Sequence, residues 1–311
     1  MGKKIGILTS GGDSPGMNAA VWAAVKSAAS RGIDMVGIYR GYQGLIDGDT
    51  KPLTVKDVEG ILNRGGTVLK TARCRKMLTE EGRADAVKGA EKAGLDGLIV
   101  VGGNGSYAGA AILAARGVPA IGLPGTIDND LTYTDFTLGF DTTCATAYEA
   151  VLKVRDTMDS HERVGVVEVM GRYCGDIALK VAAATGADYV LVPEVNKDFD
   201  IQNLADRLCK LKEMGRCSFL IILAEGVHYE NPHRACQLRQ ELEAEFKRRG
   251  SDIGDIRETV LGYQQRGGPR RYGSRNAGAV HRPVSGWVQT DHIYAGCDKI
   301  RRHEGKPRRP P

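Results

Sequence analysis

The sequence predicts an α/β protein built from two lobes with mostly parallel sheets. Short apolar segments rich in β-branched residues alternate with segments of helical periodicity from Lys4 to Arg248, a pattern typical of parallel strands joined by right-handed crossovers. The 311 residues exceed the size of a typical single domain. Several predicted strands end in glycine-rich or acidic loops, and open sheets of this class bind ligands at the carboxyl ends of their strands.

The chain begins with a predicted strand, a glycine loop and a helix. The strand is Lys4 to Thr9, the loop runs from Ser10 to Gly16, and the helix is Met17 to Ala29. Glycines let the backbone approach a ligand closely, and free N–H groups in the first turn of a helix favour a phosphate. Because the loop matches neither the P-loop nor the dinucleotide-binding pattern, a plain tight turn remains an alternative.

The following segment is predicted to contain the strand Asp34 to Tyr39 and the helix Thr54 to Leu62. The loop that follows contains Arg73, which has small residues as neighbours. Its guanidinium could hold a phosphate through paired hydrogen bonds, although a solvated surface arginine is the simpler interpretation of Arg73 taken alone.

A second glycine loop follows a second buried strand. The helix Ala84 to Ala93 leads to the strand Leu95 to Val101, the loop Gly102 to Tyr107 and the helix Ala108 to Arg116. Because this loop also follows a strand and precedes a helix, it repeats the arrangement at the start of the chain. Two such loops at strand ends predict a shared site more strongly than either does alone.

An acidic loop follows the next predicted strand, Ala120 to Leu123. Pro124 to Asp130 contains two carboxylates, Asp128 and Asp130. One aspartate can accept a proton from an attacking hydroxyl while the other serves metal or water, which suits phosphoryl transfer. A surface turn is the alternative, since Asp and Asn are common in turns.

The second half of the chain repeats the alternation of helices and strands, so the second lobe is predicted to be α/β as well. The predicted helices are Thr142 to Met158, Ile201 to Glu213 and Cys236 to Arg248, and the strands are Val164 to Val169, Tyr189 to Val192 and Phe219 to Ala224.

Composition limits the cellular location and the partners. The seven cysteines form no C-x-x-C pair, and no run of 18 apolar residues occurs, so we expect a soluble cytoplasmic protein with reduced thiols and no membrane partner. The net charge is +5, but residues 269–311 carry ten basic and three acidic side chains. The excess of positive charge therefore lies in the tail and says nothing about what the globular part binds. Nucleic-acid binding through the tail is an alternative, but we do not expect it, because a disordered basic segment binds polyanions without specificity.

From Lys4 to Gly268 the chain resembles the bacterial ATP-dependent 6-phosphofructokinases. The motifs that carry the resemblance are Thr9 to Asn18 (TSGGDSPGMN), Pro124 to Asp130 (PGTIDND), Met170 to Arg172 (MGR) and Gln265 to Gly268 (QRGG). The resemblance implies two Rossmann-like three-layer lobes with the active site in the cleft between them. It also implies a homotetramer in which neighbouring subunits complete each sugar-phosphate site.

The same resemblance implies a larger ATP-binding lobe over residues 1–140 and a smaller fructose-6-phosphate-binding lobe over 141–256. Residues 257–311 are a return segment that ends in an atypical basic Arg/Pro-rich tail. The implied reaction belongs to glycolysis: the γ-phosphoryl group of Mg-ATP passes to the 1-hydroxyl of fructose 6-phosphate, giving fructose 1,6-bisphosphate and ADP.

The resemblance also assigns roles to individual residues. Asp128 is the implied general base, Thr126 and Asp130 position the substrate and the surroundings of the metal, and Arg172 and Gly12 serve the transferring phosphoryl group. The implied ATP site contains Gly12, Arg73, Cys74, Gly103, Gly105, Ser106 and Gly109. The implied sugar-phosphate site contains Thr126, Asp128, Asp130, Met170, Gly171, Arg172, Glu225, Tyr263 and Arg266, with Arg163 and Arg257 from a neighbouring subunit.

The phosphoryl donor follows from two glycines. Diphosphate-using relatives carry an Asp at the position of Gly105 and a Lys at that of Gly125, which crowd the space of an adenosyl group. Both positions are glycine in this sequence, so the resemblance favours ATP as co-substrate.

The sequence departs from the family at several positions. Asn104 stands where the family has an aspartate that serves Mg²⁺, and an amide lacks the negative charge that this hard cation prefers. Tyr263 replaces a histidine that frequently contacts the sugar in the family. At the family's allosteric site, Trp22 and Val55 replace arginines. Phosphate-bearing effectors should therefore bind poorly. Asn104 and the tail predict reduced activity, and the alternative function is a catalytically impaired sugar-phosphate or nucleotide-binding subunit.

Overall fold

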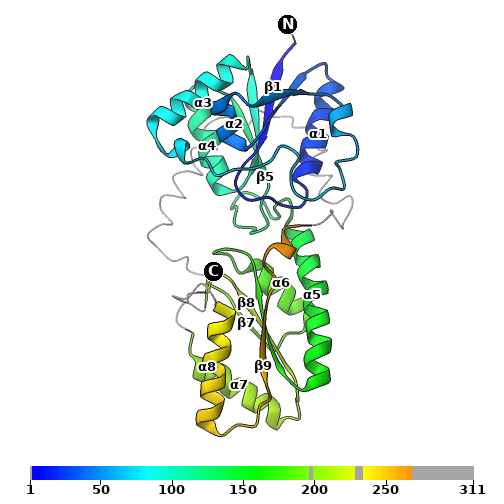
Figure 1. The fold of residues 1–311 in the computed structure, drawn as a ribbon, viewed down its shortest axis with the longest axis vertical. Coiled ribbons are helices and arrows are strands. Elements are labelled where there is room, and N and C mark those ends of the chain that lie inside the picture. Colours follow the sequence, from blue (N-terminus) through cyan, green and yellow to red (C-terminus); the bar gives the residue numbers. More distant parts are fainter. Residues whose placement is uncertain (1, 196–198, 228–233, 268–311) are drawn as a thin grey trace. The chain divides into compact units, whose positions relative to one another are not determined.

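The computed structural model describes residues 2–195, 199–227 and 234–267 (Figure 1). Its internal contacts divide the described chain into two compact units, with the division between Thr126 and Ile127. Each unit contains one sheet covered by helices on both faces. The predicted α/β class with mostly parallel sheets is confirmed.

The sheet of the first unit has the order β3-β2-β1-β4-β5. Its parallel strands are β1 (Lys4–Thr9), β2 (Asp34–Ile38), β4 (Gly97–Gly102) and β5 (Ala120–Pro124). The edge strand β3 (Thr50–Leu53) runs antiparallel to β2. Because β1, β4 and β5 are parallel neighbours, the loops that follow them emerge at the same edge of the sheet.

Among the described residues, this sheet is covered by the helices α1 (Met17–Ala29), α2 (Gly41–Asp47), α3 (Glu80–Lys92) and α4 (Asn104–Ala114). Figure 1 shows α1 on one face, and α2, α3 and α4 on the other. The latter face packs through a cluster that includes Leu8, Leu45 and Leu113, each with no exposed surface. Burying a large aliphatic side chain of this kind stabilises the fold by roughly 1.5–3 kcal/mol.

The structure corrects the prediction for the segment after β2. The predicted helix Thr54 to Leu62 is only a 3₁₀ turn, Lys56–Val58. The carboxylate of Asp57 accepts hydrogen bonds from the backbone N–H and hydroxyl of Thr54, and Gly60 has a positive φ of 75°. These bonds resemble a capping box at a helix start, and the left-handed Gly60 two residues after the turn is typical of a helix end.

Helix α2 was not predicted because glycines conceal it. Gly41 has a positive φ of 62°, and a Cβ at Gly44 would lie 1.6 Å from the carbonyl oxygen of Tyr39. Glycine is unfavourable in helices, so the sequence indicated a loop. The close approach of the backbone to itself requires glycine here despite that cost.

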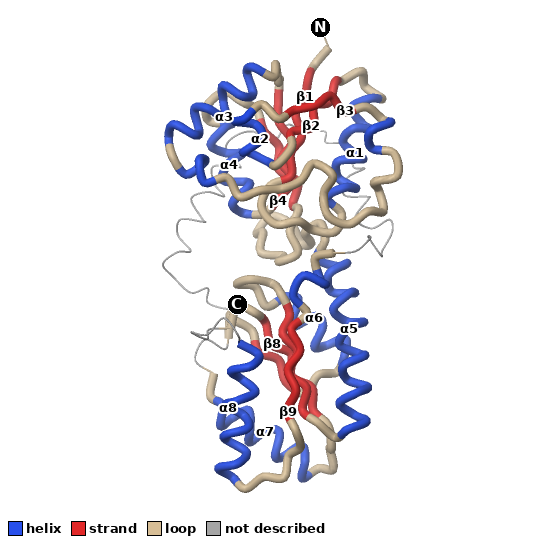
Figure 2. The backbone as a smooth tube through the Cα atoms, in the orientation of Figure 1, coloured by secondary structure: helices blue, strands red, loops and turns tan. Residues whose placement is uncertain are grey.

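The second unit contains the sheet β7-β8-β6-β9, in which all strands are parallel. The strands are β6 (Val164–Val169), β7 (Tyr189–Leu191), β8 (Phe219–Ala224) and β9 (Ile256–Val260). Helices α5 (Phe140–His161) and α6 (Asp176–Thr185) lie on one face, and α7 (Ile201–Glu213) and α8 (Arg234–Arg249) lie on the other (Figure 2). A 3₁₀ turn, Gly262–Gln265, follows β9. Helix α6 and strand β9 were not predicted from the sequence.

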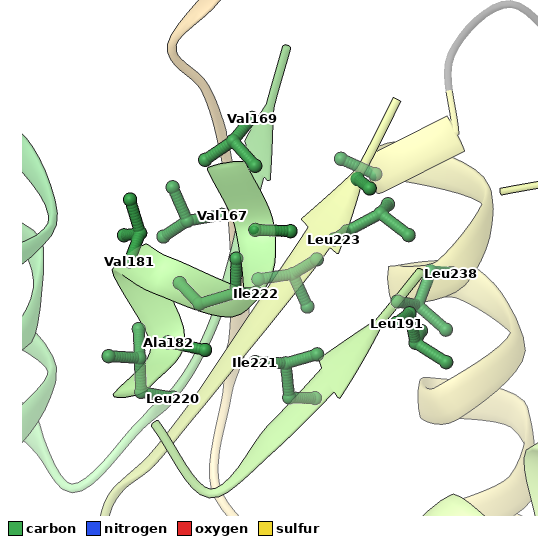
Figure 3. Close-up of a cluster of buried hydrophobic side chains, with 14 of the residues drawn as sticks. Val167, Val169, Val181, Ala182, Leu191, Leu220, Ile221, Ile222, Leu223 and Leu238 are labelled. Atoms are coloured by element: carbon green, nitrogen blue, oxygen red, sulfur yellow. The ribbon is translucent and has the colours of Figure 1, made fainter. Parts of the chain in front are cut away.

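The core of the second unit lies around its two central strands. Every residue of β6 and β8 is buried, as expected for parallel strands covered on both faces. Figure 3 shows Ile221 and Leu223 of β8 near Leu191 of β7 and Leu238 of α8. Val167 and Val169 belong to the same cluster.

The second unit begins earlier than the predicted boundary at residue 140. Ile127 is 1% exposed and belongs to the core of the second unit. The loop that carries Asp128 and Asp130 is therefore anchored in this unit. Within the described residues, no helix combines the length and the apolar character needed to cross a membrane.

Candidate active site

Hydrogen bonds join the three loops at the carboxyl edge of the first sheet. Ser10 N–H donates to the carbonyl oxygen of Val101 at 3.0 Å. The hydroxyl of Ser106 donates to the carbonyl oxygen of Ser10 at 3.0 Å, and Gly125 N–H donates to the carbonyl oxygen of Gly102 at 3.0 Å. The structure therefore brings together the two glycine loops and the start of the acidic loop.

The residues predicted for the nucleotide lie on or near this edge. Gly12 is exposed in the loop after β1, and Gly103 precedes helix α4. The loop that contains Thr71 contacts the first glycine loop, because the hydroxyl of Thr71 donates to the carbonyl oxygen of Gly11 at 2.8 Å. Arg73 is exposed in that loop, and the neighbouring Cys74 contacts Gln43. The edge thus offers glycine backbone, hydroxyls and one guanidinium.

Three of the glycines predicted for the nucleotide and for donor choice, Gly105, Gly109 and Gly125, differ in what surrounds them. A Cβ at Gly105 would meet nothing within 4 Å, so this position faces open space. A Cβ at Gly109 would lie 2.7 Å from the ring of Tyr42, and one at Gly125 would lie 2.8 Å from Val101. The packing of the protein itself therefore favours glycine at positions 109 and 125, even without a ligand. At position 105, packing within the chain does not require glycine.

Asn104 is the first residue of α4 and follows Gly103 directly. This places its amide in the first turn of a helix, where the backbone dipole favours anions such as phosphate. Among the described residues, no group of three His, Cys, Asp or Glu side chains could hold a metal ion. Mg²⁺ at nucleotide sites is usually held by one or two carboxylates together with the phosphates, and Asn104 supplies a neutral amide at this position.

Asp128 is the centre of the charged cluster in the second unit. The residue is only 7% exposed. The pKa of its carboxyl is raised to about 6, mainly by burial and also by the negative charges of Asp130 and Glu225, against the lowering effect of the positive charges of Arg266 and Arg172. The structure thus brings together five of the predicted site residues.

Glu225 orders the loop after β6. One of its carboxylate oxygens accepts hydrogen bonds from the backbone N–H groups of Gly171 at 3.2 Å and Arg172 at 2.6 Å. Both residues have positive φ angles, 140° at Gly171 and 54° at Arg172. The Arg172 guanidinium lies 5.5 Å from the ring centroid of Tyr173. A left-handed arginine is costly, and the two bonds to Glu225 help to hold it.

A cavity of about 210 Å³ lies at the carboxyl ends of β6 and β8. Its walls include the predicted residues Met170, Glu225 and Tyr263. Tyr263 is 84% exposed, so its phenol is accessible to a ligand. The cavity therefore combines apolar surface with polar side chains, as small-molecule sites do.

Two residues near this cavity were not predicted as part of the site. Gln265 has no exposed surface, its side-chain oxygen accepts from Met170 N–H at 2.9 Å, and its carbonyl oxygen accepts from the Thr143 hydroxyl. Its Nε2 has no hydrogen-bond partner among the described residues. Glu168 is 8% exposed, lines the cavity and accepts from Ala235 N–H. The signal in the sequence was a single carboxylate in the otherwise apolar segment 164–169.

Arg163 and Arg257 do not join the cluster around Asp128 in this chain. Arg163 precedes β6, and Arg257 pairs with Gly165 near the amino ends of β6 and β9. Both guanidinium groups contact the carboxylate of Asp255. They therefore lie at the edge of the sheet opposite to Met170 and Glu225.

Comparison with known proteins places these features in a family. The phosphofructokinase family model matches residues 4–279, which extends past Gly268 into the tail. The ATP-dependent 6-phosphofructokinase of Clostridioides difficile is 50% identical over 266 residues, covering 86% of this chain and 79% of that protein.

Solved structures agree with this result. Phosphofructokinase from Saccharomyces cerevisiae has a TM-score of 0.78 and 34% identity, covering 99% of this chain, which spans 42% of the yeast chain. The pyrophosphate-dependent phosphofructokinase from Marinobacter aquaeolei, at 21% identity, covers 97% of this chain and 76% of its own and shares the fold with a TM-score of 0.71. The extent of the family match, the identity to a curated relative and the two sheets with their loops show that this chain belongs to the phosphofructokinase family.

Proposed function

We propose that this chain is an ATP-dependent 6-phosphofructokinase, which transfers the γ-phosphoryl group of ATP to the 1-hydroxyl of fructose 6-phosphate in glycolysis. The observation that carries the proposal is the environment of Asp128. It is a buried carboxylate with a raised pKa, close to the charges of Arg172 and Arg266. The ATP-dependent relative in Clostridioides difficile, at 50% identity, supports the choice of reaction.

Asp128 has the properties of a general base for this reaction. A pKa of about 6 leaves the carboxylate ionised at neutral pH, yet makes it more basic than an ordinary aspartate. A base with a pKa near the working pH transfers protons most effectively. Asp128 accepts the proton of the 1-hydroxyl as its oxygen attacks phosphorus, and fixed guanidinium charges such as that of Arg172 offset the negative charge of the transition state.

The remaining predicted residues divide between the two ligands. Met170, Gly171, Glu225, Tyr263 and Arg266 bind the sugar phosphate, and Thr126 and Asp130 position it. The cavity that Met170, Glu225 and Tyr263 line supports this assignment. Gly12, Gly103, Gly105 and Ser106 bind the nucleotide through the loop edge of the first sheet, and Arg73 reaches its phosphates. The open space at Gly105 suits an adenosyl group.

Magnesium enters this proposal through the nucleotide. Mg²⁺ bound with the nucleotide would offset the negative charge of the ATP phosphates. Asn104 supplies only a neutral amide, which would hold Mg²⁺ less strongly than an aspartate at the same position. We expect weak binding of the Mg-ATP complex as a result.

We further propose a cytoplasmic homotetramer in which subunits share their sugar-phosphate sites. The positions of Arg163 and Arg257 support this assembly. Both lie at the sheet edge away from Met170 and Glu225, so they can serve a sugar phosphate only in another subunit. Size measurement in solution, together with mixing of Arg257→Ala and Asp128→Asn subunits, tests the assembly, because shared sites allow mixed tetramers to regain activity.

A coupled assay for fructose 1,6-bisphosphate tests the reaction. The chain and its Asn104→Asp variant are each supplied with Mg-ATP and fructose 6-phosphate. Turnover by the parent supports the proposal directly. Turnover by the variant alone supports the scaffold and identifies residue 104 as the defect.

The alternative is a catalytically impaired subunit that binds sugar phosphate or nucleotide. Asn104 is the observation that favours it, because the amide carries no charge for Mg²⁺. Calorimetric binding of fructose 6-phosphate without turnover in either protein would support this alternative. Turnover by the purified parent at a rate typical of kinases, ~1–100 s⁻¹, would exclude it.

A further inference from the structure

Asn129 lies between the two acids of the site in an unusual backbone conformation. Its φ is 55°, in the left-handed region, whereas its neighbours Asp128 and Asp130 are not among the described residues with positive φ. Asparagine tolerates this region better than most residues, although a non-glycine residue there still costs about 1–2 kcal/mol. A conformation of this kind persists only where surrounding contacts hold it.

The amide of Asn129 makes those contacts at both of its ends. Its Oδ1 accepts a hydrogen bond from Thr137 N–H at 3.0 Å. Its Nδ2 donates to the carboxylate of Asp176 at 2.9 Å, with a longer contact of 3.4 Å to the carbonyl oxygen of Asp135. A carboxamide offers both the donor and the acceptor that these contacts need.

Both partners of Asn129 are fixed parts of the second unit. Thr137 is 1% exposed and lies just before α5. Asp176 is the first residue of α6 and closes the loop that carries Gly171 and Arg172. The amide therefore connects the acidic loop to the segment that presents the Arg172 guanidinium.

The chain on either side of Asn129 is anchored by apolar packing. Ile127 is 1% exposed and Leu131 is 8% exposed. Anchors at 127, 129 and 131 leave little freedom for the two residues between them. Asp128 and Asp130 are close enough for the charge of one to raise the pKa of the other.

We propose that Asn129 is a positioning residue, whose two-ended amide clamp to Thr137 and Asp176 holds Asp128 and Asp130 in the geometry that phosphoryl transfer requires. This inference rests on the proposed function, because it assigns Asn129 a role in that reaction. It assigns no contact between Asn129 and substrate.

Three variants distinguish the effect of losing the hydrogen bonds of the clamp from the effects of backbone conformation and of charge. Asn129→Gly permits the positive φ but removes both hydrogen bonds. Asp176→Ala removes one acceptor, whereas Asp176→Asn keeps an acceptor oxygen and loses only the charge. Asn63→Gly, at an exposed turn in the first unit, is the matched control for the same exchange.

Steady-state kinetics with Mg-ATP and fructose 6-phosphate gives the first readout. Because a displacement of about 1 Å can cost on the order of 100-fold in rate, we expect kcat of Asn129→Gly and Asp176→Ala to fall by roughly 10–100-fold. KM for ATP should stay close to the parental value, and Asp176→Asn should keep most of the parental kcat. Where parental turnover is low, the series is built on Asn104→Asp. Equal kcat values for Asn129→Gly and Asn63→Gly would overturn the proposal.

Amide hydrogen exchange at Thr137 gives a second readout that needs no activity. We expect slow exchange in the parent and in Asp176→Asn, and faster exchange in Asn129→Gly, which lacks the acceptor. Fast exchange in the parent would show that the clamp is absent and would overturn the proposal. No turnover in the parent or in Asn104→Asp, with Thr137 still protected, would instead overturn the proposed function and the positioning role while leaving the clamp intact.

Discussion

The two units present different chemistry at the carboxyl edges of their sheets. In the first unit the edge is made of glycine backbone and hydroxyls, joined by bonds such as that from Ser106 to Ser10. In the second unit the edge gathers charged side chains around Asp128, whose pKa is raised to about 6. The difference indicates that the first edge is suited to binding phosphate groups, whereas the second is suited to proton transfer and charge stabilisation.

The largest test of this comparison removes the base from the second unit. We expect Asp128→Asn to lower kcat by about 10²–10⁴-fold, the usual contribution of a general base. Because Asn keeps the size and polarity of the side chain, binding of fructose 6-phosphate should persist in calorimetry. A variant that retained parental turnover would show that the charged cluster is not the reacting centre.

The same variant has an expected effect on stability. The raised pKa of Asp128 adds stability that is fully present below its ordinary value of 3.8 and is lost as pH rises through about 6. The Asp128→Asn variant has no carboxyl at this position, so it does not lose this stability as pH rises. Its free energy of unfolding relative to the parent should therefore increase by up to roughly 3 kcal/mol between pH 4 and pH 8, since each pKa unit corresponds to about 1.4 kcal/mol. Chemical denaturation at both pH values measures the difference.

The next test adds a charge to the first unit. We expect Asn104→Asp to raise kcat/KM for Mg-ATP by roughly 10–100-fold, the range associated with residues that support a metal site. KM for fructose 6-phosphate should change little. An equal gain with Asn63→Asp, at an exposed turn of the same unit, would attribute the effect to net charge rather than to residue 104.

A matched pair of glycine variants sharpens the comparison within the first unit. Gly125→Ala places a Cβ 2.8 Å from Val101, so we expect a loss of about 1–3 kcal/mol in the free energy of unfolding. Gly105→Ala meets nothing within 4 Å and lies in α4, where alanine is favoured by roughly 0.5–1 kcal/mol. If the nucleotide lies over Gly105, its variant should raise KM for ATP without destabilising the fold. Unchanged KM would remove Gly105 from the nucleotide site.

The smallest expected effect concerns pH. Asp130 and Glu225 raise the pKa of Asp128, and Arg172 and Arg266 lower it, with burial as the largest influence. Because only the ionised carboxylate accepts a proton, kcat/KM should fall to about half of its plateau near pH 6 and decline further below it. An inflection near pH 4 would show that Asp128 is not desolvated in the working enzyme.

The sequence predicted most of the regular elements because their patterns are local. The bounds of β1, α1, β6, α7 and β8 agree with the predicted ranges. It failed at helix α2, where glycine has a low helix propensity but Gly44 is required because a Cβ would lie 1.6 Å from the carbonyl oxygen of Tyr39. Helix α6 was missed as well, although Asp176 begins it and its alanines favour helix.

Part of the site was predictable for the same reason. Five charged residues expected from the motifs, Asp128, Asp130, Arg172, Glu225 and Arg266, do interact in the second unit. The hydrogen bonds of Gln265 and Asn129 were not predicted, because their partners, Met170 and Asp176, lie far away in the sequence. Predictions that fall on residues 268–311 lie outside the described part of the chain.

By itself, the sequence determined the α/β class, the order of loops at the strand ends and the family, because these follow from local periodicity and from motifs that are contiguous in the chain. Only the tertiary structure decided that the acidic loop is anchored in the second unit, that Asp128 is desolvated with a raised pKa, and that Asn129 is held by Thr137 and Asp176. Burial and charge depend on distances between segments that are separated in the sequence, and folding alone sets those distances.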